Sequence, residues 1–248
     1  MAAGEEGAGG FDLRGFIPNS LLEWEDHVAA VAVTGGCNLR CPFCHSWRYV
    51  SGLDGLPRLD PEKLFATLSR QRDWVDGVVF TGGEPTLQPG LAGMIRRARG
   101  LGARVKLHTN GCRPGVVRDL LEEGLLDCLA LDYKAPLDGR FFAAAGIPPD
   151  PGTLAAVRET FGLARDREVE REYHTTLVPK FVDEGAFSEM ADWLEPEGLW
   201  ILQQFENGDC LDSGMSGTPG YGRERLEVFA ARAGAGHGRV LLKKGKSA

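Results

Sequence analysis

The sequence has no long apolar run and no excess of basic residues. The longest uninterrupted apolar stretch, Val28 to Val33, is far below the ~20 residues that a membrane-spanning helix needs. The formal net charge is -7, which gives no field that would concentrate a polyanion at the surface. These absences argue against a membrane protein and against a nucleic-acid-binding protein.

The first residues also lack the features of a secretory signal. Residues 1–10 are rich in glycine, alanine and glutamate, with no basic region followed by an apolar one. Such a stretch predicts a flexible tail, because it cannot bury enough apolar surface to offset its ordering entropy. We expect residues 11–248 to form a single catalytic domain in the cytoplasm. Because thiols stay reduced there, six cysteines favour metal or redox chemistry over disulfides.

Short apolar or β-branched runs alternate with helical patterns along the chain. The expected strands are 27–34, 75–81, 104–109, 126–132, 169–178, 199–205 and 239–242. The expected helices are 60–71, 89–99, 114–123, 152–165, 184–194 and 222–233. This alternation predicts a parallel sheet with right-handed crossovers. Roughly six such units fit, so we expect an α/β fold, an open, partial (β/α)6 TIM-like barrel with parallel strands.

Polar clusters follow four of the expected strands, at the ends where α/β barrels place their chemistry. The clusters are Thr34-Gly35-Gly36-Cys37, Thr81-Gly82-Gly83-Glu84-Pro85, His108-Thr109-Asn110-Gly111 and Asp132-Tyr133-Lys134. We expect them to share one rim of the barrel.

The first of these polar clusters ends at Cys37, and Cys37, Cys41 and Cys44 lie within a single stretch of eight residues. One loop could therefore present three thiolates to three corners of an iron–sulfur cube. The fourth iron would have no protein ligand, and an open coordination position usually marks a catalytic rather than a structural metal site.

Three alternatives for this loop stay open. A structural zinc site needs a fourth ligand, and His45 lies directly beside Cys44, where adjacent residues rarely reach one tetrahedral centre together. Cys41 and Cys44 alone resemble a glutaredoxin-type pair, which leaves Cys37 and the glycine-rich loop unexplained. Buried thiols without a ligand would account for the other cysteines but not for three in one polar loop.

The CxxxCxxC spacing, with Phe43 before the third cysteine, is followed at the end of the next strand by Gly82-Gly83-Glu84-Pro85. This combination resembles the radical S-adenosylmethionine (SAM) superfamily. In that family the open iron is chelated by the amino and carboxylate groups of SAM, and the GGEP loop contacts the amino group. The resemblance implies two cofactors: a [4Fe-4S] cluster on Cys37, Cys41 and Cys44, and SAM itself.

The resemblance and the chemistry of the motif together predict a SAM-binding set. Glycines let the backbone approach a ligand closely, and the Glu84 carboxylate could accept charge-assisted hydrogen bonds from the ammonium group. By resemblance, Asp132 and Lys134 would help to hold SAM, and Asn110 would lie near its sugar. The full predicted set is Phe43, Gly82, Gly83, Glu84, Pro85, Asn110, Asp132 and Lys134. No catalytic side chain is assigned, because cluster-bound SAM would be the reactive group.

A longer similarity runs from about residue 14 to about residue 207. Its segments include Gly15-Phe16-Ile17-Pro18, Thr109-Asn110-Gly111, Asp132-Tyr133-Lys134, Leu177-Val178-Pro179 and Gln203-Gln204-Phe205. They resemble anaerobic ribonucleotide-reductase activating proteins and, more loosely, pyruvate formate-lyase activating enzyme. This implies a glycyl-radical enzyme as the protein substrate. It also implies flavodoxin or ferredoxin as the electron donor, because Cys112, Cys128 and Cys210 are too far apart in the sequence to form a second cluster.

Three positions depart from those families. His108 stands where the pyruvate formate-lyase activator has an Asp of a monovalent-cation site, and Glu206 stands where it has a SAM-contacting histidine. The Pro-Gly turn of the activating proteins is absent from residues 22–26. A radical SAM enzyme acting on a small molecule, for example a modified-purine synthase, therefore stays open, as does a structural metal-binding module. A short chain favours the activase, because a protein substrate could itself cover an open barrel.

Overall fold

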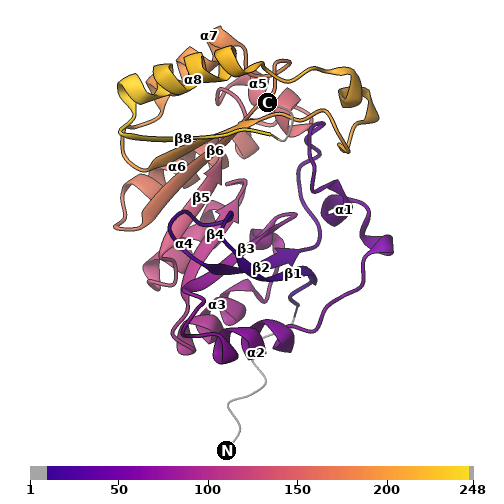
Figure 1. Ribbon diagram of the computed structural model, residues 1–248, viewed down its shortest axis with the longest axis vertical. Coiled ribbons are helices and arrows are strands. Elements are labelled where there is room, and N and C mark those ends of the chain that lie inside the picture. The colour runs from indigo at the N-terminus through magenta and orange to yellow at the C-terminus, as the bar shows by residue number, and fades with distance from the viewer. Residues whose placement is uncertain (1–9, 246–248) are drawn as a thin grey trace, which may run out of the picture.

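The computed structural model describes residues 10–245, so the expected flexible tail lies outside the described residues except for Gly10. One sheet of eight strands follows the order of the sequence from β1 to β8. The pair β1–β2 is antiparallel, and the six other neighbouring pairs are parallel. The sheet curves from β1–β3 to β6–β8, and helices cover its outer face (Figure 1). The expected α/β fold with an open, partial barrel is confirmed.

The strands are β1 Leu13–Ser20, β2 Ala29–Thr34, β3 Gly77–Gly82, β4 Arg104–Thr109, β5 Cys128–Asp132, β6 Glu170–Leu177, β7 Leu199–Gln204 and β8 Arg239–Lys243. The α-helices are α1 Trp47–Val50, α2 Glu62–Arg70, α3 Leu91–Gly100, α4 Pro114–Glu122, α5 Gly139–Ala145, α6 Pro151–Arg165, α7 Glu184–Trp193 and α8 Arg223–Gly236. Three 3-10 turns are η1 Leu53–Gly55, η2 Pro85–Leu87 and η3 Ser213–Gly217. No helix within residues 10–245 is long and apolar enough to cross a membrane.

Apart from the 3-10 turns, three elements were not expected from the sequence: strand β1, the four-residue helix α1 and helix α5. Strand β1 contains Gly15 and Pro18, residues that weaken the pattern of a strand, and it lies at an edge of the sheet where both are tolerated. Helix α5 is only seven residues long, too short for a clear periodic signal. Strand β8 corresponds to the expected strand at 239–242, and it completes a parallel part of seven strands, β2 to β8.

The helices begin and end where the sequence places capping residues. The Asp60 carboxylate accepts a hydrogen bond from the Glu62 backbone N–H at 3.0 Å, which satisfies a free donor in the first turn of α2. Helix α4 begins with Pro114 and is followed by Gly124 at φ +64°, a left-handed conformation that glycine adopts without a steric cost.

The inner face of the curved sheet is divided into an apolar and a polar part. Val31, Val33 and Val79 pack with Trp24, whose side chain is only 1% exposed. On the neighbouring strand β4, Lys106 is paired in register with Val79 and is fully buried. A barrel interior is usually filled by branched apolar side chains, so a buried charged group there needs partners of its own.

Candidate functional site

A cavity of about 460 Å³ opens at the carboxyl ends of the parallel strands. Every predicted cluster and SAM residue except Pro85 lines it: Cys37, Cys41, Phe43, Cys44, Gly82, Gly83, Glu84, Asn110, Asp132 and Lys134. The four polar clusters of the sequence therefore do share one rim. Pro85 is buried at the start of η2 instead, where its fixed φ suits the first position of a turn. A contact between Pro85 and SAM stays a prediction.

The cysteine loop is fixed on one side by the end of α5. The Arg40 backbone N–H donates to the Ala145 carbonyl at 2.9 Å. The next residue, Gly146, has φ +65°, and a Cβ added there would lie 1.9 Å from the Arg40 carbonyl oxygen. Only glycine allows this approach, so α5 ends in contact with the loop between its first and second cysteines.

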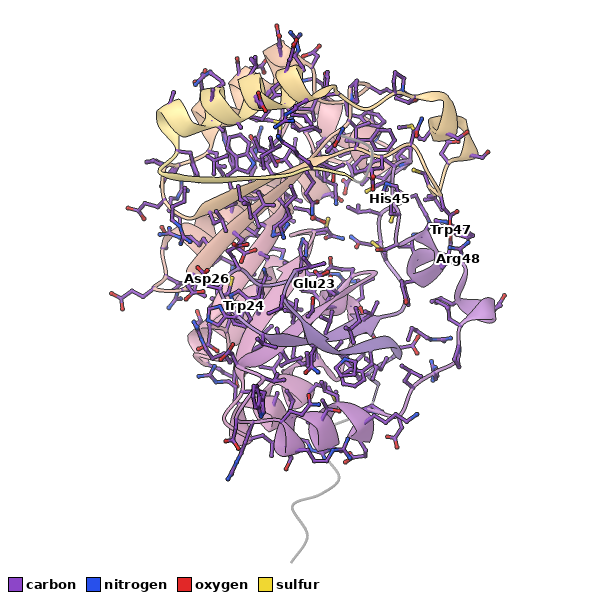
Figure 2. All side chains as sticks on the ribbon, in the orientation of Figure 1. Glu23, Trp24, Asp26, His45, Trp47 and Arg48 are labelled. Atoms are coloured by element: carbon purple, nitrogen blue, oxygen red, sulfur yellow. The ribbon has the colours of Figure 1, made fainter. Side chains whose placement is uncertain are left out.

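On its other side the loop contacts the segment after β7. The Leu211 backbone N–H donates to the Cys44 carbonyl at 3.1 Å. Asp209 accepts from the Trp47 indole at 2.9 Å and pairs with the Arg48 guanidinium at 2.5 Å. Figure 2 shows Trp47 and Arg48 beside His45, at the start of α1. Segments more than 160 residues apart in sequence thus hold the third cysteine and the helix that follows it.

The glycine-rich loop after β3 lies directly on the cysteine loop. The Glu84 backbone N–H donates to the Gly36 carbonyl at 2.8 Å. A Cβ at Gly83 would lie 2.0 Å from that same carbonyl oxygen, and Gly82 has φ +117°. The two glycines are therefore required for contact between two backbone segments as well as for any approach to a ligand.

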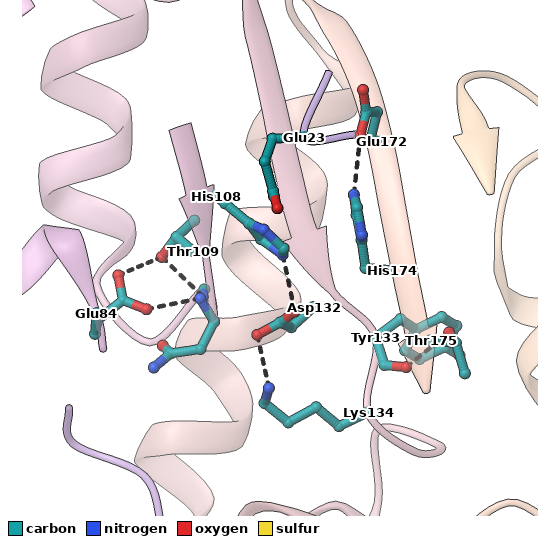
Figure 3. Close-up of polar contacts among 12 residues, drawn as sticks. Glu23, Glu84, His108, Thr109, Asp132, Tyr133, Lys134, Glu172, His174 and Thr175 are labelled. Atoms are coloured by element: carbon teal, nitrogen blue, oxygen red, sulfur yellow. Dashed lines mark hydrogen bonds and ion pairs between the residues drawn. The ribbon is translucent and has the colours of Figure 1, made fainter. Parts of the chain in front are cut away.

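The Glu84 carboxylate is buried at 1% exposure and bonded to the protein itself (Figure 3). Oε1 accepts from the Thr86 and Thr109 hydroxyls, each at 2.6 Å, and from the Thr86 backbone N–H at 3.1 Å. Oε2 accepts from the Asn110 backbone N–H at 2.8 Å. Burial raises the pKa of Glu84 despite these hydrogen bonds. This side chain joins the end of β3 to the end of β4, and its direct contact with SAM stays a prediction.

Asp132 and Lys134 face the same cavity from the end of β5. The Asp132 carboxylate bonds to His108 Nε2 at 3.0 Å and to Lys134 Nζ at 2.6 Å (Figure 3). Burial alone would raise the pKa of Asp132, but the Lys134 ammonium and the His108 imidazole outweigh it and hold the pKa well below its usual range. Asp132 is therefore a carboxylate, and the Lys134 ammonium next to it places a positive charge near the thiols.

The three thiols have a donor set that fits an iron–sulfur cluster. All three are free, and all line the one cavity. Burial raises the pKa of Cys37 and of Cys41 to about 11, so a bound cation is needed to stabilise the thiolates. Within residues 10–245 no three His, Cys, Asp or Glu side chains converge on a single ion. The thiolates of a cube each bind a different iron, so they surround a volume rather than a point.

Beneath the cavity, polar side chains continue into the interior of the barrel. Lys106 Nζ pairs with Glu172 at 2.5 Å and donates to the Glu23 carbonyl at 2.7 Å. Glu172 also bonds to His174 Nε2 at 2.9 Å, and the His174 ring lies 4.4 Å from that of His108 (Figure 3). Burial, followed by the neighbouring His108, lowers the pKa of His174 to about 4, so this imidazole is neutral. Lys106, Glu172, His174 and His108 thus form a polar column that runs from the barrel interior to the cavity, which His108 lines.

Several residues of the cavity were not singled out as site residues from the sequence. The wall formed by β6, β7 and β8 contributes Thr176, Gln203 and Lys243. Each is a polar residue at or near the carboxyl end of a strand, the same signal that identified the other four clusters. The remaining cysteines do not line the cavity; Cys128, for example, is buried near Glu172.

Comparison with known proteins places this geometry in a family. The model of the radical SAM superfamily matches residues 31–194. A Methanocaldococcus jannaschii protein named as a glycyl-radical enzyme activating enzyme is 29% identical over 209 residues, covering 84% of this chain and 85% of the relative. A 7-carboxy-7-deazaguanine synthase of Hyperthermus butylicus is 44% identical over 85 residues, covering 34% and 35%.

The fold is also that of a SAM-binding protein. The crystal structure of Streptococcus suis SuiB bound to S-adenosylmethionine aligns with a TM-score of 0.59 at 13% identity, over 85% of this chain and 45% of SuiB. The family model spans the strands that carry the cysteine loop, the glycine-rich loop and the Asp132–Lys134 pair. The chain belongs to the radical SAM superfamily, whose members use a [4Fe-4S] cluster and S-adenosylmethionine.

Proposed function

We propose that the protein activates a glycyl-radical enzyme. In this proposal residues 11–248 act as one catalytic domain, and Cys37, Cys41 and Cys44 hold the [4Fe-4S] cluster. The cluster and SAM, when bound, supply a 5'-deoxyadenosyl radical that takes a hydrogen atom from a glycine of the partner. The observation that carries the proposal is the similarity to the M. jannaschii activating enzyme, which extends over 84% of this chain.

The residues of the cavity have distinct tasks in this proposal. The GGEP loop is hydrogen-bonded to the cysteine loop through the Gly36 carbonyl, and it would present its backbone to the SAM amino group. Lys134, held by Asp132, would attract the SAM carboxylate, because a half-buried ammonium offers a charge-assisted hydrogen bond to an anion. Asn110 Nδ2 lies 3.8 Å from Cys37 Sγ and 2.8 Å from Asn38 Oδ1, so Asn110 would hold the SAM sugar beside the cysteine loop.

The same cavity also suits a second candidate function. The 7-carboxy-7-deazaguanine synthase similarity is higher in identity but covers only a third of either chain. A small-molecule substrate would have to be enclosed by the protein itself, whereas the sheet edges β1 and β8 leave this barrel open. The open side therefore favours a protein substrate, whose own surface could cover the opening.

The test begins with anaerobic reconstitution with iron and sulfide, followed by reduction with flavodoxin or ferredoxin and assay for 5'-deoxyadenosine. Glycyl-radical enzymes from the same organism are then added one at a time. The proposal expects an electron paramagnetic resonance doublet only when SAM, reductant and one such partner are present together. Release of 5'-deoxyadenosine labelled from a deuterated small metabolite, with no glycyl signal from any partner, would establish the second candidate instead.

A further inference from the structure

Three polar side chains form a row on the wall of the cavity built by β6, β7 and β8. Thr176 is paired in register with Gln203, and Gln203 with Lys243. All three line the same cavity as the cysteines. Figure 1 shows the strands of this wall in the upper part of the molecule, with β1–β3 below them. The row therefore belongs to the part of the cavity that the predicted cluster and SAM residues do not occupy.

The side chains of Thr176 and Gln203 are not used by the fold. Within residues 10–245 neither side chain forms a hydrogen bond, although both are half-buried. The neighbouring Gln204 differs, because its Oε1 accepts from the Gly245 N–H at 2.8 Å and its Nε2 donates to the Tyr221 carbonyl at 3.0 Å. Since half-buried polar groups usually find partners, the Gln203 carboxamide and the Thr176 hydroxyl have bonding capacity for a ligand.

The row lies beside the open side of the barrel. Strands β1 and β8 are the two edges of the sheet. Lys243 of β8 donates through Nζ to the carbonyl of Leu22, in the segment after β1, at 2.8 Å. This bond joins the two edges, and Gln203 lies on the strand next to β8. An extended polypeptide could reach Gln203 through the mouth of the cavity, at the carboxyl ends of the strands.

We propose that Gln203, together with Thr176, binds the backbone N–H and C=O of the glycine that donates its hydrogen atom. A carboxamide offers a donor and an acceptor side by side, the complement of the N–H and C=O of one residue, which point the same way in an extended chain. Because glycine has no side chain, both of its flanking peptide groups are accessible. Thr176 and Gln203 would therefore recognise the backbone of the substrate rather than a side chain. The inference rests on the proposed function and names how its protein substrate is recognised.

The test uses the reconstituted enzyme with SAM and a blocked peptide, acetyl-Ala-Ala-Gly-Ala-Ala-amide, deuterated at the glycine Cα. Mass spectrometry measures deuterium in the 5'-deoxyadenosine as a function of peptide concentration. Gln203→Leu should raise the KM for the peptide about tenfold, because both hydrogen bonds are lost. Gln203→Glu keeps the acceptor and should raise KM less. Cleavage of SAM without peptide should be unchanged in both variants.

Gln71→Leu is the matched control, because Gln71 also has a carboxamide oxygen without a partner but lies outside the cavity. An unchanged peptide KM in Gln203→Leu, with normal deuterium transfer in the wild type, overturns this inference alone. No deuterium transfer from the peptide or from any glycyl-radical enzyme overturns the proposed function. If guanine, whose ring carries a cis amide, stimulates SAM cleavage in the wild type but not in Gln203→Leu, and the peptide stimulates it in neither, the subsite binds a small lactam and the peptide assignment is wrong.

Discussion

Removal of the Glu84 carboxylate should destabilise the protein before any cofactor is bound. The carboxylate is the acceptor for two backbone N–H groups, of Thr86 and Asn110, and for two threonine hydroxyls. In Glu84→Ala the hydroxyls can rotate toward other acceptors, but the two N–H groups cannot. The loops that carry the predicted SAM contacts would then lose the bridge between β3 and β4.

The size of the effect follows from the two orphaned donors. A buried donor left without a partner costs about 1–3 kcal/mol, so Glu84→Ala should lower the free energy of unfolding by about 2–6 kcal/mol. In Glu84→Gln the amide oxygen can replace Oε1, but its NH2 group would face the Asn110 N–H. We expect a smaller loss of about 1–3 kcal/mol for this variant. Out of a typical stability of about 5–15 kcal/mol, both changes are large.

The measurement is urea unfolding of the protein without iron or SAM. Glu62→Ala is the control, because Glu62 is exposed and contacts only the surface guanidinium of Arg97, where a change should leave the midpoint almost unmoved. The reasoning would be refuted by a Glu84→Ala protein that unfolds like the wild type and fails only to bind SAM. That result would make the carboxylate a ligand group rather than a bridge between strands.

Three further predictions concern other parts of the molecule. Cys41→Ala should hold no [4Fe-4S] cluster after anaerobic reconstitution, whereas Cys128→Ala should keep its full iron and sulfide content, as chemical analysis can show. Gly83→Ala should lower the melting temperature and abolish SAM binding, because its Cβ would collide with a backbone carbonyl; Gly115→Ala, with no atom within 4 Å, should do neither in calorimetry. The pKa of His174 is lowered from 6.5 to about 4, so the unfolded chain takes up a proton first as the pH falls. Stability should be complete above pH 6.5 and fall by about 3 kcal/mol toward pH 4, and His174→Gln should flatten this part of the urea-unfolding profile.

The parallel sheet was predictable because each strand is a short apolar run between capped helices. β4 has the expected bounds, and α4 differs only by one residue at its end. The antiparallel strand β1 was missed, since its pairing is decided by the free edge of β2 rather than by its own glycine- and proline-containing pattern. Local periodicity thus predicts the helices and the parallel strands. Whether a segment joins the edge of the sheet depends on pairing with strands that are distant in sequence.

The candidate site likewise has a part that the sequence predicted and a part that it could not predict. Residues such as Cys37 and Lys134 follow strand ends, and the rule for parallel sheets brings them to one cavity. The bonding of Glu84 could not be predicted, because its donors come from another strand end and from residues with no special composition. The pairing of Lys106 with Glu172 was equally hidden. Lys106 alternates with apolar neighbours just as an exposed residue of a half-buried strand would, and Glu172 directly follows the charged residues Glu170 and Arg171.

The cysteine loop is fixed to the rest of the fold mainly through its backbone. Its contacts with Glu84, Ala145 and Leu211 are backbone hydrogen bonds, contributed by three widely separated parts of the chain. The loop can take this shape only after β3, α5 and the segment after β7 have reached their places, so a cysteine peptide cut from the chain would not reproduce it. Because these anchors need no cluster, the folded chain can present three thiols at one cavity before iron arrives. Loss of the cluster should therefore leave the barrel folded, which separates this site from structural zinc modules, whose folding depends on the bound ion.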